Sequence, residues 1–190
     1  MKAVQALTLT VLLVAGASTQ LLKPGKCPSP AVQANFDASK YLGKWYGIRK
    51  LPTSFQKGQC STANYTLEGP GVIGVLNSEL LDDGTISSAV GSAKVKDPTE
   101  PAKLEVSFSE DSPPGPYWVL SSDYDGHSLV YSCTDYGLFH KELSWIMSRE
   151  STLPEETIEK LLNTLSSIGV SVDKMVPTIQ DESYCSAMNE

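Results

Sequence analysis

The stretch YLGKWYGIRKLP, from Tyr41 to Pro52, places a tryptophan two residues after a glycine in a run that mixes apolar and basic side chains. The run is strand-like, yet Lys44, Arg49 and Lys50 give it an unusual amount of positive charge. What a large aromatic side chain does at the start of such a strand depends on the sheet that the rest of the chain can build.

Short runs with alternating apolar and polar residues follow, separated by turn residues. With the opening run, the expected strands are residues 41–52, 60–68, 72–81, 85–95, 103–109, 116–124, 127–133 and 142–150. Alternation with period two is typical of β-strands. The pairs Asp83-Gly84 and Asp125-Gly126 predict hairpins with type I′ turns, in which both central residues have positive φ.

After Arg149 the apolar period becomes that of a helix. One helical face carries the apolar residues Ile158, Leu161, Leu162, Leu165 and Ile168. Thr152 and Glu155 have the spacing of a capping box, Pro154 is expected in the first turn, and Gly169 supplies a stop. A single apolar stripe predicts a helix on the outside of a sheet. We therefore expect an all-β fold, an eight-stranded up-and-down antiparallel barrel with one C-terminal α-helix packed outside.

The N-terminus indicates the compartment. Lys2 precedes an apolar run and then small residues, so residues 1–19 are expected to be a cleaved secretory signal and residues 20–190 one secreted domain. A membrane anchor is the alternative, but the run is well short of the roughly 20 apolar residues that a spanning helix needs. The net charge of -7 argues against nucleic acid and anionic membrane surfaces as main partners.

The cysteines and histidines point away from catalysis and metal binding. An even number of cysteines in a secreted chain predicts two long-range disulfides, with three pairings open, among Cys27, Cys60, Cys133 and Cys185. None is spaced as CxxC, which argues against a zinc site. His127 and His140 lack recognisable catalytic partners and are expected on the solvated surface. We expect no cofactor, no metal and no enzymatic activity.

Three motifs resemble the conserved regions of the lipocalins: Gly43-Lys44-Trp45 in the first strand, Ser122-Asp123-Tyr124 at a later hairpin, and Arg149 at the end of the eighth strand. The resemblance implies that Trp45 closes one end of the barrel and that Gly43 admits a close approach of the backbone there. Arg149 would lie over the indole in a cation–π contact of roughly 0.5–2 kcal/mol, with the neighbouring lysines in solvent. It also implies the disulfide pairing Cys27–Cys133 and Cys60–Cys185.

Asn64-Tyr65-Thr66 is a glycosylation sequon. A glycan on Asn64 must face outward, so Ala63, Tyr65 and Leu67 are expected to point into the barrel. The resemblance likewise makes Tyr65 part of the ligand cavity.

The eighth strand supplies further candidates for ligand contact. Leu143, Trp145 and Met147 share the face of Arg149, and by resemblance Trp145 lines the pocket. Plain core packing is the alternative, and it is the favoured one for Leu143 and Met147. Asn77 matches a polar pocket residue of the family, but a solvated strand end is an equal alternative. Tyr41 is expected to pack against the N-terminal arm rather than against a ligand.

The resemblance implies a secreted, glycosylated, monomeric carrier of a small hydrophobic ligand: a fatty acid such as arachidonic acid, a steroid such as progesterone, or a bilin. Some members of the family associate with lipoproteins through an apolar loop and an additional cysteine. Here the loop SFSEDSPPGPYW is acidic and Asp135 replaces the cysteine, which argues against lipoprotein association. Two other functions stay open. One is a protective or signalling glycoprotein acting through its surface; the other is a prostaglandin-isomerase-like enzyme, which four paired cysteines oppose.

Overall fold

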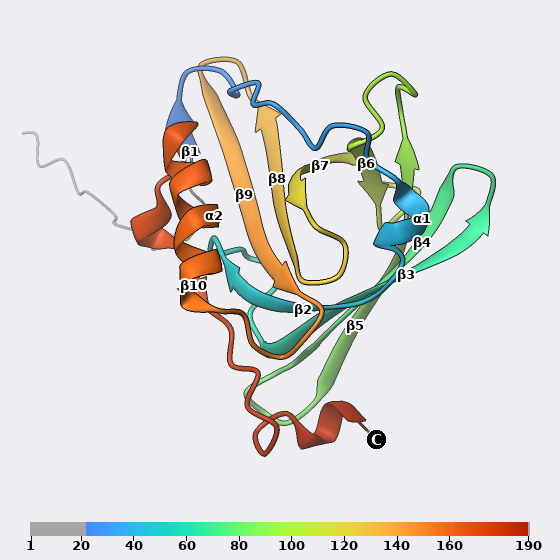
Figure 1. The fold of residues 1–190 in the computed structure, drawn as a ribbon, viewed down its shortest axis with the longest axis vertical. Helices are drawn as coiled ribbons and strands as arrows, with labels where there is room; N and C mark the ends of the chain where they lie inside the picture. The colour runs from blue at the N-terminus through green and yellow to red at the C-terminus, as the bar shows by residue number, and fades with distance from the viewer. Residues whose placement is uncertain (1–21, 190) are drawn as a thin grey trace, which may run out of the picture.

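The structure, a computed structural model, describes residues 22–189, so the expected signal of residues 1–19 lies outside the described residues. Its main feature is a closed antiparallel sheet (Figure 1). The barrel strands are β2 (Gly43–Lys50), β3 (Gln59–Gly69), β4 (Val72–Leu80), β5 (Ile86–Val95), β6 (Lys103–Ser107), β7 (Gly115–Ser122), β8 (His127–Asp135) and β9 (Phe139–Ser148). Each pairs with the next, and β9 pairs back with β2 to close the ring. The predicted eight-stranded up-and-down barrel is confirmed.

Short elements that no pattern predicted extend this barrel. β1 (Leu22–Pro24) pairs with β9, and β10 (Val176–Pro177) pairs with β2. They are too short to show alternation in the sequence. The four-residue helix α1 (Ala38–Tyr41) precedes β2, and the Asp37 carboxylate caps it by accepting the N–H of Ser39. Two short 3₁₀ helices, Val172–Lys174 and Ser186–Asn189, lie in the C-terminal tail.

Helix α2 (Glu155–Ser167) lies on the outside of the barrel beside β9, as predicted (Figure 1). Leu161 and Leu165 are buried in one cluster with Leu129 and Ile146 from the outer face of β8 and β9. The predicted stop is also present: Gly169 has a φ of +87°, the Gly169 N–H donates to Ser166, and the Val170 N–H donates to Leu165. This pattern is a Schellman motif, which satisfies the last carbonyls of the helix.

The predicted capping box is wrong. Pro154 occupies the N-cap position, and no side chain caps the helix there. Thr152 instead accepts a hydrogen bond from the Ser148 hydroxyl at its backbone carbonyl. Glu155 and Glu156 still place negative charge in the first turn, where it favours the helix dipole.

Both predicted hairpins form, but neither has the predicted type I′ turn. In the first, Gly84 has a φ of +83° while Asp83 does not have a positive φ, and the Gly84 N–H donates to the Leu81 carbonyl. In the second, the positive φ belongs to Tyr124, at +68°. Carboxylates of Asp83 and Asp123 accept backbone N–H groups in these loops, so side-chain hydrogen bonds stabilise a different turn geometry.

A bulge in β2 changes which residues face inward. The pairing with β9 shifts between Gly47 and Arg49, so Arg49 lies opposite Ile146 and Lys50 opposite Trp145. As a result Lys50 is buried, and its ammonium donates to the carbonyls of Gln56 and Gly58. The expectation that the lysines of this strand all point to solvent is therefore wrong for Lys50.

Two further expectations about side-chain positions are wrong. Leu67 is 67% exposed, because it lies close to the β3–β4 turn, where the hairpin projects from the barrel (Figure 1). His140 belongs to β9 rather than to a loop; it is buried, and its Nδ1 lies 3.0 Å from the Gly25 carbonyl. His127 is half-buried at the start of β8 and lies 3.0 Å from Asp123.

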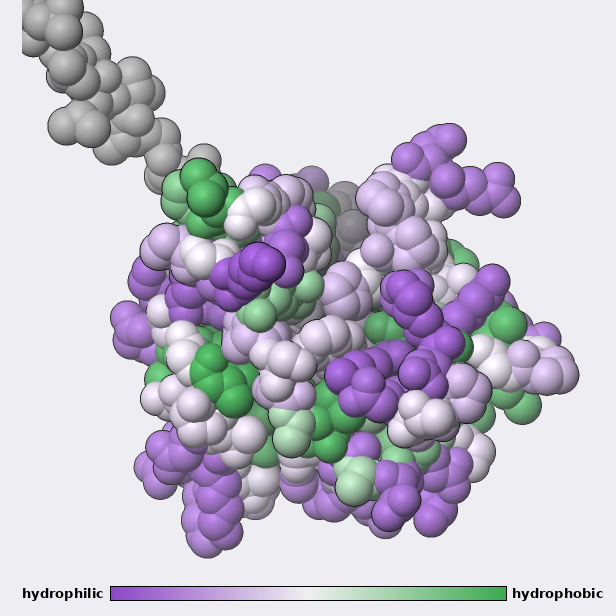
Figure 2. Space-filling view, turned by 90° about the horizontal axis from the view of Figure 1, so that it is seen from above, coloured by the Kyte–Doolittle hydropathy of each residue, from purple (hydrophilic) through white to green (hydrophobic). Residues whose placement is uncertain are grey.

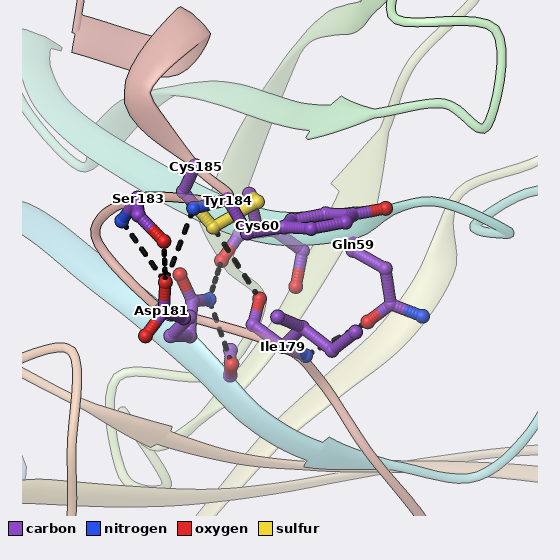
Figure 3. The surroundings of a disulfide bond; sticks show 10 residues. Gln59, Cys60, Ile179, Asp181, Ser183, Tyr184 and Cys185 are labelled. Carbon is purple, nitrogen blue, oxygen red and sulfur yellow. Dashed lines mark hydrogen bonds between the residues drawn. A yellow bond between two sulfur atoms is a disulfide. The ribbon is translucent and has the colours of Figure 1, made fainter.

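Two disulfides, Cys27–Cys133 and Cys60–Cys185, hold the two ends of the domain on the barrel. Figure 3 shows the second, which ties the C-terminal tail to the start of β3. There the Cys60 N–H donates to the Ile179 carbonyl and the Ile179 N–H donates to the Gln59 side chain. The pairing is the one that the resemblance implies.

On the face shown in Figure 2, hydrophilic side chains predominate and hydrophobic ones form small separate patches. Among residues 22–189, none of the helices combines the length and the apolar character that a membrane-spanning helix requires.

Candidate functional site

One end of the barrel is closed by aromatic packing around Trp45. The indole is completely buried, and its N–H donates to the Tyr41 carbonyl at 2.9 Å. The Arg149 guanidinium carbon lies 3.8 Å from the centre of the Trp45 rings. Gly43 has a φ of +91°, a conformation that other residues adopt only with strain. Trp45 and Arg149 therefore have the arrangement that the resemblance implies. The expected close approach of backbone at Gly43 is wrong: a Cβ there would meet only the Arg149 side chain, at 3.4 Å, so the positive φ is what requires glycine.

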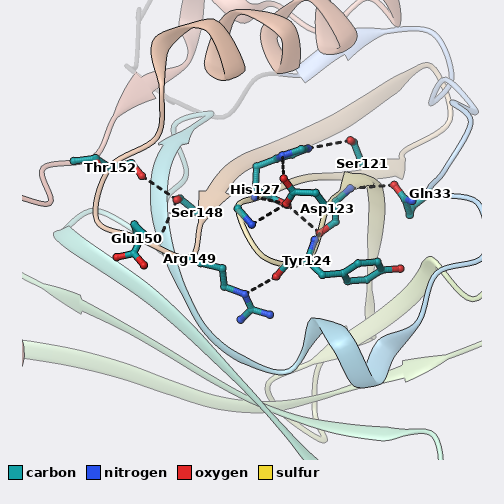
Figure 4. A network of polar contacts seen from close by, with 11 residues as sticks. Gln33, Ser121, Asp123, Tyr124, His127, Ser148, Arg149, Glu150 and Thr152 are labelled. Atoms are coloured by element: carbon teal, nitrogen blue, oxygen red, sulfur yellow. Dashed lines mark hydrogen bonds and ion pairs between the residues drawn. The ribbon is translucent and has the colours of Figure 1, made fainter.

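Arg149 also joins the segments that meet below this floor (Figure 4). Its Nε donates to the Tyr124 carbonyl, and its two terminal nitrogens donate to the carbonyls of Lys44 and Lys40. Burial lowers the pKa of the Arg149 guanidinium, and the charges of Tyr41 and Asp125 partly offset this effect. The guanidinium thus contacts three backbone carbonyls and the face of the indole.

Above this floor the barrel is hollow. The cavity has a volume of about 480 Å³, within the range of sites for small molecules. Its deep wall is apolar and includes Ile73, Val75, Ala93 and Leu104. On the β5 side the cavity opens because β5 pairs with β6 only from Ser92 to Val95, which leaves the first half of β5 exposed.

All five residues predicted for ligand contact line this cavity: Tyr65, Asn77, Leu143, Trp145 and Met147. Tyr65 and Met147 are buried, and the other three are half-buried. Trp145 donates its indole N–H to the Gln56 side chain at 2.9 Å. These positions make ligand contact geometrically feasible; the contacts themselves stay a prediction.

Two tyrosines extend this set beyond the sequence prediction. Tyr41 and Tyr117 line the cavity directly above Trp45, and the Tyr117 hydroxyl lies 2.8 Å from the Tyr65 hydroxyl. The sequence predicts that Tyr41 packs against the N-terminal arm rather than against a ligand; it does contact Phe36, but it also lines the cavity. Alternation along β7, with Trp118 outside and Tyr117 and Val119 inside, is the sequence signal that could have identified Tyr117.

Burial governs the acidity of these phenols. It raises the pKa of Tyr41 to about 12, and it raises the pKa values of Tyr65 and Tyr117 as well. The wall therefore keeps neutral hydroxyl groups near neutral pH.

The loop between β2 and β3 lies at the mouth of the cavity. Phe55 and Gln56 in this loop line the mouth, and the Glu79 carboxylate accepts the Gly58 N–H at 2.7 Å. Burial lowers the pKa of Lys50, an effect that the Glu79 charge partly offsets. Phe108 and Pro113 of the acidic β6–β7 loop also line the cavity.

The outer wall carries the predicted glycosylation position. Asn64 is half-buried in β3, opposite Lys44 on β2 and Leu76 on β4. It is absent from the cavity lining, whereas its neighbour Tyr65 belongs to it. Within residues 22–189, no group of three or more histidine, cysteine or acidic side chains is arranged to hold a metal ion.

Residues 36–180 match the family described as Lipocalin-like domain. Apolipoprotein D of Mus musculus is 52% identical over 162 residues, which cover 85% of each chain. The Lazarillo protein of Schistocerca americana is 30% identical and covers 84% of this chain and 77% of its own length.

Solved structures give the same result for the fold. Lobster apocrustacyanin A1 superposes with a TM-score of 0.76 at 25% identity, over 89% of this chain and 97% of its own. Insecticyanin of the tobacco hornworm Manduca sexta superposes with a TM-score of 0.76 at 27% identity, over 87% of this chain and 92% of its own. The chain therefore belongs to the lipocalin family.

Proposed function

We propose that this chain is a secreted carrier that binds one small hydrophobic molecule in the barrel and transports it. The observation that carries the proposal is the hollow apolar cavity above the floor formed by Trp45. A fatty acid such as arachidonic acid, a steroid such as progesterone, and a bilin are the candidate ligands that the family resemblance supplies. Tyr65, Asn77 and Trp145 are the polar or aromatic contacts that would orient such a ligand, and Leu143 and Met147 add apolar surface.

Burial of apolar surface would drive the binding. A ligand that loses about 400 Å² of apolar accessible surface gains about 10 kcal/mol. Several kcal/mol of lost translational and rotational freedom offset this gain. The balance corresponds to roughly micromolar affinity or tighter.

Adjacent residues on opposite faces of β5 provide a test. Ala89 lines the cavity, whereas Val90 points outward and is 71% exposed. Ala89→Trp should obstruct the open side of the cavity and weaken binding of a fatty acid or a steroid about tenfold or more, and Val90→Trp should leave it unchanged. Displacement of a fluorescent hydrophobic probe measures both affinities. Equal affinities in the two variants would show that the ligand binds outside the barrel.

The cysteines favour a carrier over an isomerase. All four are paired, so no thiol is present to act in the cavity. Secretion as a monomer with a glycan on Asn64 is part of the proposal, and the two disulfides support an oxidising compartment. We do not extend it to lipoprotein particles, because the β6–β7 loop at the mouth is acidic.

A surface-acting protective or signalling glycoprotein is the competing function. It would bind its protein partner whether or not the cavity is filled. A pull-down should then capture the same proteins before and after delipidation. It should also capture the same proteins with Ala89→Trp as with the unmodified chain. Both results together would favour this function over transport.

A further inference from the structure

A chain of hydroxyl groups lies on the cavity floor. The Ser128 hydroxyl lies 2.6 Å from the Tyr41 hydroxyl, which lies 3.1 Å from that of Tyr117. The Tyr117 hydroxyl in turn lies 2.8 Å from that of Tyr65. Four O–H groups thus share three hydrogen bonds, so one of the four protons has no acceptor among these hydroxyl groups.

The surroundings of Ser128 show that this spare proton belongs to a tyrosine and not to the serine. Its side chain is fully buried, and among residues 22–189 the Tyr41 hydroxyl is the only partner of its oxygen. Leaving a buried donor unpaired is costly, so Ser128 donates to Tyr41. The spare proton then belongs to one of the tyrosines, all three of which line the cavity. The floor therefore offers a hydrogen-bond donor to a ligand.

Among the described residues, no positively charged side chain lines the cavity beside this donor. Within the described part of the chain, Glu79 is the one charged side chain that lines the cavity, and it is negative. The charge of Arg149 acts on the Tyr41 hydroxyl from beneath Trp45, but Arg149 does not line the cavity, and its N–H groups donate to three backbone carbonyls. Burial also keeps the three phenols neutral. An ionised carboxylate at this depth would be a buried charge that no cationic side chain of the cavity contacts, which is far more costly than a buried neutral oxygen.

We propose that the cavity selects lipids that carry an uncharged oxygen (a hydroxyl, ketone or ester) and holds that oxygen at the floor against the Tyr65 and Tyr117 hydroxyls. The inference rests on the proposed carrier function and narrows its ligand class. The hydrocarbon part then extends past Trp145 toward the mouth. An ionised fatty acid fits only in the reverse direction, with its carboxylate at the rim, where the Lys141 ammonium lies 6.0 Å from the Phe55 ring.

Methyl decanoate and decanoate, which share one acyl chain, test the proposal near neutral pH. Displacement of a fluorescent probe from the complete secreted protein gives both affinities. We expect the ester to bind about tenfold more tightly than the ionised acid. In the double variant Tyr65→Phe/Tyr117→Phe the ester should lose about 3- to 10-fold in affinity, as expected for one neutral hydrogen bond, while decanoate changes less than about twofold. Tyr46→Phe, which removes a hydroxyl outside the cavity, is the matched control and should change neither affinity.

The outcomes separate this inference from the proposed function. Decanoate binding as tightly as the ester, or a double variant that weakens both ligands equally or neither, would overturn the inference and leave the carrier function intact. Failure of the unmodified chain to bind any of the probes would overturn both. The comparison of the two ligands on the unmodified chain needs no variant, and near-ultraviolet circular dichroism checks that the double variant is folded.

Discussion

At the scale of single residues, Arg149 connects several segments of the closed end. It stacks on Trp45 and donates to the carbonyls of Tyr124, Lys44 and Lys40. These carbonyls belong to the β7–β8 loop, to β2 and to α1, segments that the sequence separates widely. One side chain thus holds together the three parts of the chain that form the floor.

Removal of this side chain should destabilise the fold more than it affects the ligand site. Arg149→Ala loses the cation–π contact and the hydrogen bonds to the carbonyls, so we expect the free energy of unfolding to fall by about 2–4 kcal/mol. Arg49→Ala removes only an ion pair with Glu155 at 3.5 Å on the outer face and should cost less than about 1 kcal/mol. Urea unfolding measures both. Equal losses would mean that the floor does not depend on Arg149.

The buried tyrosines give the fold a specific dependence on alkaline pH. Burial raises the pKa values of Tyr41, Tyr65 and Tyr117, that of Tyr41 to about 12, above the ordinary value of about 10. The folded state therefore keeps protons that the unfolded chain releases. This contribution to stability is complete below pH about 10 and is lost as the pH rises toward 12.

The expected result is a free energy of unfolding that declines across this alkaline range, with phenolate absorbance from the buried tyrosines that develops as the protein unfolds. Tyr65→Phe/Tyr117→Phe should show a shallower decline, because two of the shifted groups are absent. Buried phenols that ionise near pH 10 while the near-ultraviolet circular dichroism stays native would contradict this prediction.

The positions of Trp45 and Arg149 could be predicted from the sequence, whereas the contacts among the cavity tyrosines could not. Trp45 and Arg149 could be placed because their motifs lie at recognisable strand positions. The contact of Tyr41 with Tyr117 joins residues 76 positions apart, and that with Ser128 joins residues 87 apart. No local pattern encodes such a contact, because it depends on how neighbouring strands are staggered in the closed barrel.

At the scale of elements, the C-terminal end of α2 shows how one backbone conformation ends a helix. Gly169 has a φ of +87°, and a Cβ built there would meet no other atom within 4 Å. The conformation alone therefore requires glycine, since no close packing excludes a side chain. Leu165 before this turn and Val170 after it are both buried in the outer core.

Gly169→Ala should lower the free energy of unfolding by about 1 kcal/mol, because alanine is strained at positive φ. Gly69→Ala is the matched control: it also has open space around its Cβ position but no positive φ, so its effect should stay within about 0.5 kcal/mol. Thermal or urea unfolding of the two variants provides the comparison. A control as destabilised as Gly169→Ala would rule out the conformational explanation.

Element prediction from the sequence succeeded where a period repeats and failed where geometry is local. All eight barrel strands and α2 were predicted, because alternation or helical spacing continues through each of them. The bulge at Gly47 and Arg49, which turns Lys50 inward, leaves no mark in the pattern of residue types. The turns at Asp83 and Asp123 likewise depend on side-chain capping, which competes with the predicted type I′ geometry.

At the scale of the whole molecule, the outer face of the closed sheet packs against a helix, whereas the inner face surrounds the cavity. The outer face of β8 and β9 packs against α2, and this core is dense. The inner face is packed only near Trp45, where Phe36, Val119 and Val130 complete the floor, and it is hollow above. Stability therefore comes mostly from the closed end and the outer core, which leaves the upper barrel free to accept a ligand.

The central claim is that a ligand enters this hollow and places an uncharged oxygen on the floor. A crystal structure of the chain with bound methyl decanoate tests it most directly. We predict electron density inside the barrel above Trp45, with an ester oxygen within hydrogen-bond distance of the Tyr65 or Tyr117 hydroxyl and the acyl chain directed past Trp145. A barrel filled by the chain's own side chains, or an ester bound with its oxygen at the mouth, would contradict the account.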